Sequence, residues 1–159
     1  MGYKEGVVEK GGDNLNMLIG EYTYTLDTKR RLAIPAKFRK LLGTKAVITK
    51  GLDNCLFLFP VKEWGKLAEK LSQLPLGQAD ARGFARFMLA GATDVTIDSL
   101  GRILIPDYLK KHAKMKKKVV ITGLSNKIEI WDEKEWDDYK IKTEKEAGSI
   151  AERLGALGI

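Results

Sequence analysis

Cysteine and histidine are almost absent from this chain, and long apolar runs are missing altogether. Cys55 and His112 are the only residues of their types among 159. A single thiol cannot build an internal disulfide framework, so we expect the reducing environment of a cytoplasm. No stretch of about 18 apolar residues occurs, which predicts no membrane-spanning helix and no membrane partner. The first six residues also lack the apolar core of a signal peptide.

Motifs for catalysis or for cofactor binding are missing as well. The sequence contains no Gly-rich phosphate loop, no H-E-x-x-H, no paired cysteine ligands and no G-x-S-x-G. His112 ends a Lys-rich segment and Cys55 lies at a tight turn, and neither has a base nearby along the chain. We therefore expect no enzyme, no cofactor, no metal and no small-molecule substrate. A metal or ligand bound near His112 would reopen the enzyme alternative.

Acidic residues are outnumbered by basic ones. The chain has 28 Lys and Arg against 21 Asp and Glu, a net charge of +7 and an isoelectric point of about 9.4. This balance favours a polyanionic partner such as DNA, although many basic proteins bind no nucleic acid. A hydrophobic fraction of 44% is typical of a folded globular protein.

The chain contains an internal repeat. Residues 25–35 align with residues 96–106 at an offset of 71, and both segments follow D-x-x-x-R-x-x-I-P. At an offset of 72, residues 51–59 align with 123–131, and the Lys-Glu-Trp at 62–64 aligns with that at 134–136. Two matching blocks in the same order, separated by one single-residue indel, indicate a duplication.

Each copy is predicted to run strand, strand, helix, strand, strand. The first copy has strands over 22–26, 31–34, 46–49 and 56–59, and a helix that Pro35 opens and Gly43 stops. The second copy has strands over 95–97, 102–105, 119–122 and 128–131, and a helix from Pro106 to His112. In each copy a three-residue turn is expected to join the first two strands into a hairpin.

Two units of about 45 residues can bury their apolar faces against each other, which predicts an α+β fold with pseudo-twofold symmetry. The expected parts are 1–16 as a disordered extension or tag, 21–63 and 92–135 as the two copies, 64–91 as connecting helices and 136–159 as a C-terminal helix. In the connection, 61–74 reads as an amphipathic helix and 83–91 as a second, more buried helix. Residues 133–157 are helical with an apolar stripe, formed by Ala147, Ile150, Ala151, Leu154 and Leu157.

Positive charge is concentrated in the same part of both copies. Seven basic residues lie between positions 27 and 45 and seven more between 98 and 118, against one and two acids. A two-stranded ribbon fits the DNA major groove, and Lys and Arg supply salt-sensitive phosphate contacts. A solvated charged surface is the plainer alternative. The candidate DNA-binding residues are Lys29, Arg30, Arg31, Lys37, Arg39 and Arg102.

An Asp and an Arg flank each predicted turn, as Asp27 with Arg31 and Asp98 with Arg102. Each Asp can pair with its Arg or accept hydrogen bonds from N–H groups of the turn, which is a structural role. The Asp can also orient its Arg toward a phosphate or a guanine edge. We favour the structural, hairpin-orienting role for Asp27 and Asp98 and the functional role for the two arginines.

These motifs also carry a resemblance to a known family. D-x-x-x-R-L-x-I-P-A-K-F-R followed by a second D-x-x-G-R-x-x-I-P resembles the MraZ family, transcriptional regulators with two tandem SpoVT-AbrB-type halves. The segment from Met17 to Tyr22 and the later I-E-I-W-D-x-x-x-W are similar to that family too. The likeness runs from Met17 to about Leu157, and residues 1–16 lie outside it.

The resemblance implies a swapped-hairpin fold and a cytoplasmic, nucleoid-associated protein that assembles into ring-like homo-oligomers. It also implies repression through short direct repeats upstream of the cell-division and cell-wall gene cluster, with DNA contact from the D-x-x-x-R motifs. An antitoxin-like protein-interaction module and a non-specific nucleoid-binding protein remain the alternatives.

The chain departs from the family pattern at the turns. Arg30 replaces the family glycine of the first motif, whereas Gly101 keeps it in the second, and Leu100 stands where the first copy has Lys29. We expect Arg30 to cost about 1 kcal/mol in a left-handed conformation while adding charge at the tip. The first turn is therefore predicted to carry more of the DNA affinity.

Overall fold

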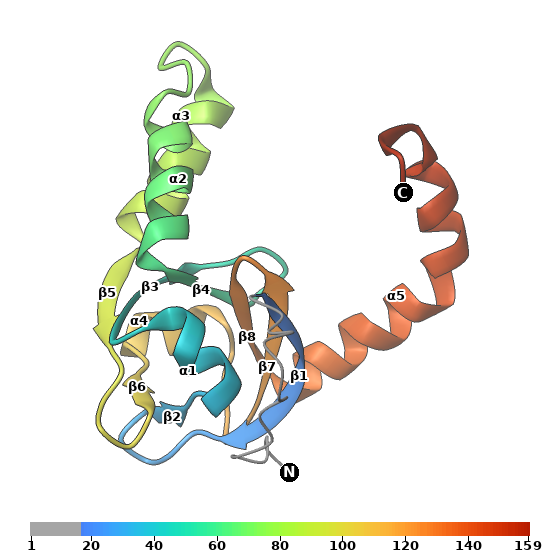
Figure 1. Cartoon of the computed structure of the whole chain (residues 1–159). Helices are drawn as coiled ribbons and strands as arrows, with labels where there is room; N and C mark the ends of the chain where they lie inside the picture. The colour runs from blue at the N-terminus through green and yellow to red at the C-terminus, as the bar shows by residue number, and fades with distance from the viewer. Residues whose placement is uncertain (1–16) are drawn as a thin grey trace, which may run out of the picture.

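The computed structural model describes residues 17–159, so the expectation for residues 1–16 lies outside the described part (Figure 1). The strands there are β1 (Leu18–Thr25), β2 (Arg31–Ala33), β3 (Lys45–Lys50), β4 (Leu56–Pro60), β5 (Thr93–Thr96), β6 (Arg102–Leu104), β7 (Lys118–Ser125) and β8 (Ile128–Asp132). The α-helices are α1 (Ala36–Leu42), α2 (Val61–Ser72), α3 (Ala79–Ala85), α4 (Asp107–His112) and α5 (Glu133–Arg153). The predicted α+β class with a duplicated unit is confirmed.

The strands form two antiparallel sheets, and both combine the two copies. The larger sheet has the order β1-β7-β8-β4-β3-β5, and β2 pairs with β6 in a separate two-stranded ribbon. The equivalent strands β4 and β8 pair at the centre, with Leu56 opposite Ile130, so the pseudo-twofold relation passes between them. The first strand of each copy pairs with the third strand of the other, since β1 pairs with β7 and β5 with β3.

The predicted hairpins between the first two strands of each copy are wrong beyond the turn itself. The turn is closed, because the Asp27 N–H donates to the Arg31 carbonyl over 3.0 Å. The preceding residue already pairs elsewhere, as the Leu26 N–H donates to Lys117 of the other copy over 2.8 Å. The chain therefore diverges after the turn, and each strand finds its partner in the other copy.

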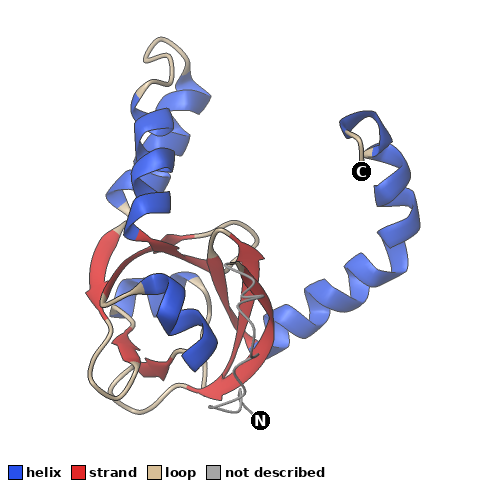
Figure 2. Ribbon diagram, viewed as in Figure 1, coloured by secondary structure: helices blue, strands red, loops and turns tan. Residues whose placement is uncertain are grey.

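The inner core lies where the sheets surround α1 and α4 (Figure 2). Alternate strand residues point inward, among them Leu56, Leu58 and Ile130, all of which are fully buried. Phe38 of α1 and Leu109 of α4 pack against them with no exposed surface. Both helices begin one residue later than predicted because Pro35 and Pro106 are their caps, and Gly43 ends α1 with φ 75° as expected.

A second apolar layer covers the outer face of β4, β7 and β8. Phe57, Val120 and Trp131, which alternate with inward-facing residues, pack there with Leu71 of α2. The expected helix over 83–91 proves to be the end of α3 followed by a π-helical turn, Arg86–Ala90, in which Met88 is the buried residue. The Thr49 hydroxyl donates to the Met88 carbonyl over 2.7 Å, which ties this turn to β3.

The helix α5 leaves the outer layer and extends away from the strands (Figure 1). Trp131 contacts Trp136 and Tyr139 with ring centroids 5.3 and 5.2 Å apart, which anchors its first turns. Asp132 caps the helix by accepting from the Lys134 N–H. None of its 21 residues is buried, and a short 3-10 turn, Gly155–Leu157, follows.

Candidate nucleic-acid interface

The β2–β6 ribbon presents a small surface that combines both D-x-x-x-R motifs. Leu32 and Ile103 are opposite each other and point into the core, so their neighbours point outward. Arg31 lies opposite Leu104, and Arg102 lies opposite Ala33. We call these four outward residues the ribbon face. Its two arginines are diagonal neighbours, roughly 7–8 Å apart at the backbone, or about two base steps of DNA at about 3.4 Å each.

The first turn is held together by its aspartate. One Asp27 carboxylate oxygen, Oδ1, accepts from the N–H groups of Lys29 and Arg31 over 2.9 and 2.8 Å. These backbone hydrogen bonds, that of Arg31 foremost, lower the pKa of Asp27. Of the two roles considered for Asp27, the structure contains the hydrogen bonding within the turn. The Lys29 side chain at the tip is exposed.

The second turn repeats these bonds and adds an ion pair. Asp98 Oδ1 accepts from the N–H groups of Leu100 and Arg102, each over 2.9 Å. Its other oxygen, Oδ2, accepts from the Arg102 side chain at Nε over 3.0 Å. The hydrogen bond from the Arg102 backbone is the main cause of the lowered pKa of Asp98. Arg102 is thus oriented by its aspartate, whereas no such ion pair links Asp27 and Arg31 in the described part of the chain.

Arg30 and Gly101 adopt the same left-handed backbone, with φ of 62° and 77°. The Arg30 side chain lies back against the second copy, where its Nε donates to the Ile105 carbonyl over 3.0 Å. At the other turn the space above Gly101 is taken by Arg39 of α1, whose guanidinium would collide with any side chain there. Arg30 therefore links the first turn to the second copy, and Arg39 of the first copy packs against the second turn.

Lys37 is the last of the candidate DNA-binding residues. It lies half-buried on α1, and the structure gives it no side-chain hydrogen bond or ion pair among the described residues. Sequence reasoning missed Leu104, which lies on the ribbon face with half of its surface exposed. The alternation of β6 could have identified it, because a buried Ile103 requires Leu104 to point outward.

Cys55 and His112 do not form a reactive site. Cys55 is fully buried, and burial raises the pKa of its thiol, the opposite of what activates a nucleophile. His112 is half-buried against Phe87, with ring centroids 5.8 Å apart, and its Nε2 lies 3.3 Å from the Gly51 carbonyl. Within residues 17–159, no cluster of His, Cys, Asp and Glu is suited to hold a metal ion. No helix in that range is both long and apolar enough to cross a bilayer.

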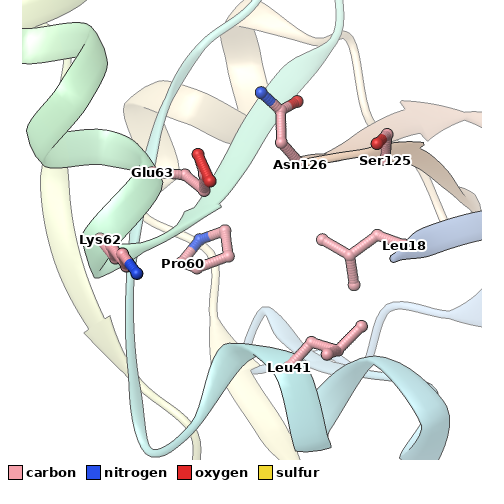
Figure 3. A pocket seen from close by; sticks show the side chains of 7 residues that line it. All are labelled: Leu18, Leu41, Pro60, Lys62, Glu63, Ser125 and Asn126. Carbon is pink, nitrogen blue, oxygen red and sulfur yellow. The ribbon is translucent and has the colours of Figure 1, made fainter. Parts of the chain in front are cut away.

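A pocket of about 480 Å³ lies at the other end of β1 from the Asp27 turn (Figure 3). Apolar and polar side chains line this pocket, among them one basic and one acidic residue. The lining residues are Leu18, Leu41, Pro60, Lys62, Glu63, Ser125 and Asn126. The Lys and the Glu offset each other, so the pocket lacks the positive field that a polyanion requires. The basic turns and the ribbon face are therefore the better candidate for binding a polyanion such as DNA.

The architecture and the site together describe a duplicated β-rich protein with Asp-braced basic turns. The family described as "MraZ protein, putative antitoxin-like" matches this chain over residues 17–87 and again over 88–155. The chain belongs to the MraZ family, as its motifs predicted.

Individual relatives agree with this membership. The chain is 50% identical over 143 residues to the "Transcriptional regulator MraZ" of Caldanaerobacter subterraneus subsp. tengcongensis, covering 90% of this chain and all of that protein. The protein of the same name from Thermoanaerobacter sp. strain X514 matches to the same extent. That of Natranaerobius thermophilus is 48% identical over 138 residues, which are 87% of this chain and 96% of the relative.

Proposed function

We propose that this protein is a sequence-specific DNA-binding regulator of transcription, which presents the ribbon face and its two turns to the duplex. One observation carries the proposal: the fold brings Arg31 and Arg102, 71 residues apart in sequence, onto one face of a two-stranded ribbon. A ribbon of this kind fits the major groove, and Arg can donate two hydrogen bonds to a guanine edge. The names of the relatives support a role in transcription.

The basic residues divide into two roles. Arg31 and Arg102 read base edges, because they project from the ribbon face. Lys29, Lys37 and Arg39 contact phosphates and supply the salt-sensitive part of the affinity. Arg30 adds charge near the tip, but its hydrogen bond to Ile105 makes it a brace between the copies as well. Asp27 and Asp98 hold the turns, and Asp98 also orients the side chain of Arg102.

Our proposals for assembly, cellular location and target genes rest on the family resemblance. We propose that the protein forms ring-like homo-oligomers, acts in the cytoplasm at the nucleoid, and represses a cell-division and cell-wall gene cluster through short direct repeats upstream of it. Assembly is supported by α5, a helix of 21 residues with none buried. Several subunits on one ring would each contribute a weak contact to a row of repeats.

Selection of bound fragments from random duplex DNA tests the proposal. A recovered direct repeat would give both the sequence and the spacing, and affinity for it should fall steeply with salt, by about 0.9 log units per tenfold salt for each phosphate contact. Equal affinity for all DNA would favour a non-specific nucleoid-binding protein. No measurable DNA affinity would favour a protein-interaction module of the antitoxin type.

A further inference from the structure

The ribbon face contains one apolar residue that protein packing does not account for. Leu104 is 50% exposed although it lies between arginines on a two-stranded ribbon. The residue at the equivalent position of the first copy is Ala33, so the two halves of the face differ most here. Single exposed leucines are common on protein surfaces, so the place of this one carries the argument: it lies opposite Arg31, on the face proposed to meet the bases of DNA.

The backbone places Leu104 next to Arg31 at the closest cross-strand distance. The Ile105 N–H donates to the Arg30 carbonyl over 2.8 Å, so the next pair along, Arg31 with Leu104, is not hydrogen-bonded. Side chains approach most closely at such positions, with Cβ atoms about 4.5–5.5 Å apart. That distance lies between one and two base steps of about 3.4 Å, so the two side chains can meet neighbouring base pairs.

We infer that Leu104 is a specificity-determining residue that contacts a thymine methyl group beside the base read by Arg31. This inference rests on the proposed function. The 5-methyl group of thymine is the apolar group that a major groove offers, and the surrounding arginines draw this face to DNA rather than to another apolar surface. Arg31, which donates hydrogen bonds, and the apolar Leu104 thus recognise two neighbouring bases together. The equivalent pair at the other end of the ribbon, Arg102 with Ala33, lacks the large apolar side chain.

Uracil substitution tests the inference, because uracil differs from thymine only by the missing methyl group. In the selected duplex, each thymine is replaced in turn by deoxyuridine, and affinity is measured by fluorescence anisotropy. One position should lose about threefold to fivefold in affinity, the change expected for one buried methyl group. The L104A variant should bind thymine and uracil equally at that position.

Two further variants make the result specific. L100A removes another exposed leucine, 68% exposed at the tip of the second turn, and should keep the discrimination. A33L places a leucine at the equivalent position of the first copy and should create a new preference for thymine at the symmetry-related base. Circular dichroism spectra that match the wild type show that each variant is folded.

Four outcomes overturn the inference. Sequence-specific binding that no uracil substitution weakens would overturn it and leave the proposed function standing, as would an L104A variant that still distinguishes thymine from uracil. A change in oligomeric mass on L104A substitution, with discrimination intact, would assign Leu104 to a subunit contact instead. Failure to select any DNA sequence would overturn the proposed function and this inference together.

Discussion

At the scale of single residues, Arg31 and Arg102 occupy equivalent positions but have different neighbours. The Nε of Arg102 is engaged by Asp98, and Leu100 precedes it at the tip. Arg31 has no ion pair within residues 17–159, and the exposed Lys29 lies two residues before it. The first turn therefore has more uncommitted charge with which to contact DNA.

We expect Arg31→Ala to weaken DNA binding by about 1–3 kcal/mol, the value of one well-placed base contact, and Arg102→Ala to weaken it less. The affinities of both variants should be measured at several salt concentrations. Lys66→Ala is a suitable control, because Lys66 is an exposed residue of α2 that pairs with Glu63 of the same helix. Equal losses for Arg31 and Arg102 would contradict the prediction.

Gly101 is needed for two separate reasons. Its φ of 77° costs an L-residue about 1–2 kcal/mol, and its missing side chain makes room for Arg39. Gly101→Ala should therefore lower the free energy of unfolding by more than the backbone cost alone, as measured by urea denaturation. In an Arg39→Ala background only the backbone cost should remain. The same loss in both backgrounds would mean that the guanidinium moves aside freely.

At the scale of elements, the two turns share a dependence on carboxylate charge. Turn N–H groups lower the pKa of Asp27 and Asp98 below the ordinary value of 3.8. A carboxyl group whose pKa is lower in the folded state stabilises the fold above its unfolded pKa, and this stabilisation is lost as the pH falls through the folded value.

The double variant Asp27→Asn/Asp98→Asn should accordingly be less stable than the wild type at pH 7. The difference in stability should stay constant down to about pH 5 and shrink as the pH falls below 3.8. Urea denaturation at a series of pH values measures it. Asp94→Asn is the control, since Asp94 is exposed on β5 with no side-chain bond among the described residues. A gap that persists unchanged at pH 3 would show that charge is not the cause.

Much of each element could be predicted from sequence, because hydrophobic alternation and prolines act locally. The predicted strand over 31–34 is observed as Arg31–Ala33, and Gly43 ends α1 as expected. The pairing of the strands was harder to predict from the sequence. A turn between two strands suggests a hairpin, and only the contact of Leu26 with Lys117, a neighbour distant in sequence, reveals that the strands separate.

In the candidate site, too, the local motifs could be predicted from the sequence and the long-range contacts could not. Asp27, Arg31, Asp98 and Arg102 were found because their motif occurs twice. The joining of both motifs on one ribbon could not be read from either copy, since it depends on β2 pairing with β6. Arg39 was chosen for its charge alone, and its place above Gly101 depends on contact between an α1 side chain and the other copy's turn.

At the scale of the whole molecule, the described part of the chain has two apolar layers and a long helix, α5, that extends away from them. The inner core joins both copies, and the outer layer seats α2 and the first turns of α5. At the far end of α5, its C-cap residue Leu154 is 38% exposed, and Leu157 of the following turn is 74% exposed. A stripe of apolar residues at helical spacing normally packs against another surface, and a second copy of this chain would supply one.

Leu154→Glu/Leu157→Glu should therefore reduce the oligomeric mass measured by light scattering, while the free energy of unfolding of the protein changes by no more than about 0.5 kcal/mol, as is usual for exposed sites. Lys145→Glu/Glu152→Lys, which exchanges exposed charges on the same helix without changing the net charge, should leave the mass unchanged. An unaltered mass in the Leu variant would mean that this stripe is not an assembly contact.

The same variant separates assembly from DNA reading. Because the stripe lies away from the ribbon face, affinity for a duplex with one repeat should be unchanged. A duplex with several repeats binds a multivalent ring more tightly than one repeat does, by about 10²–10⁴ when the spacing fits. The Leu154→Glu/Leu157→Glu protein should lose this gain, whereas Arg31→Ala should weaken binding to both duplexes. If the Leu variant kept the full gain on repeated sites, subunits would be joined through another surface, and the role of α5 would need a different explanation.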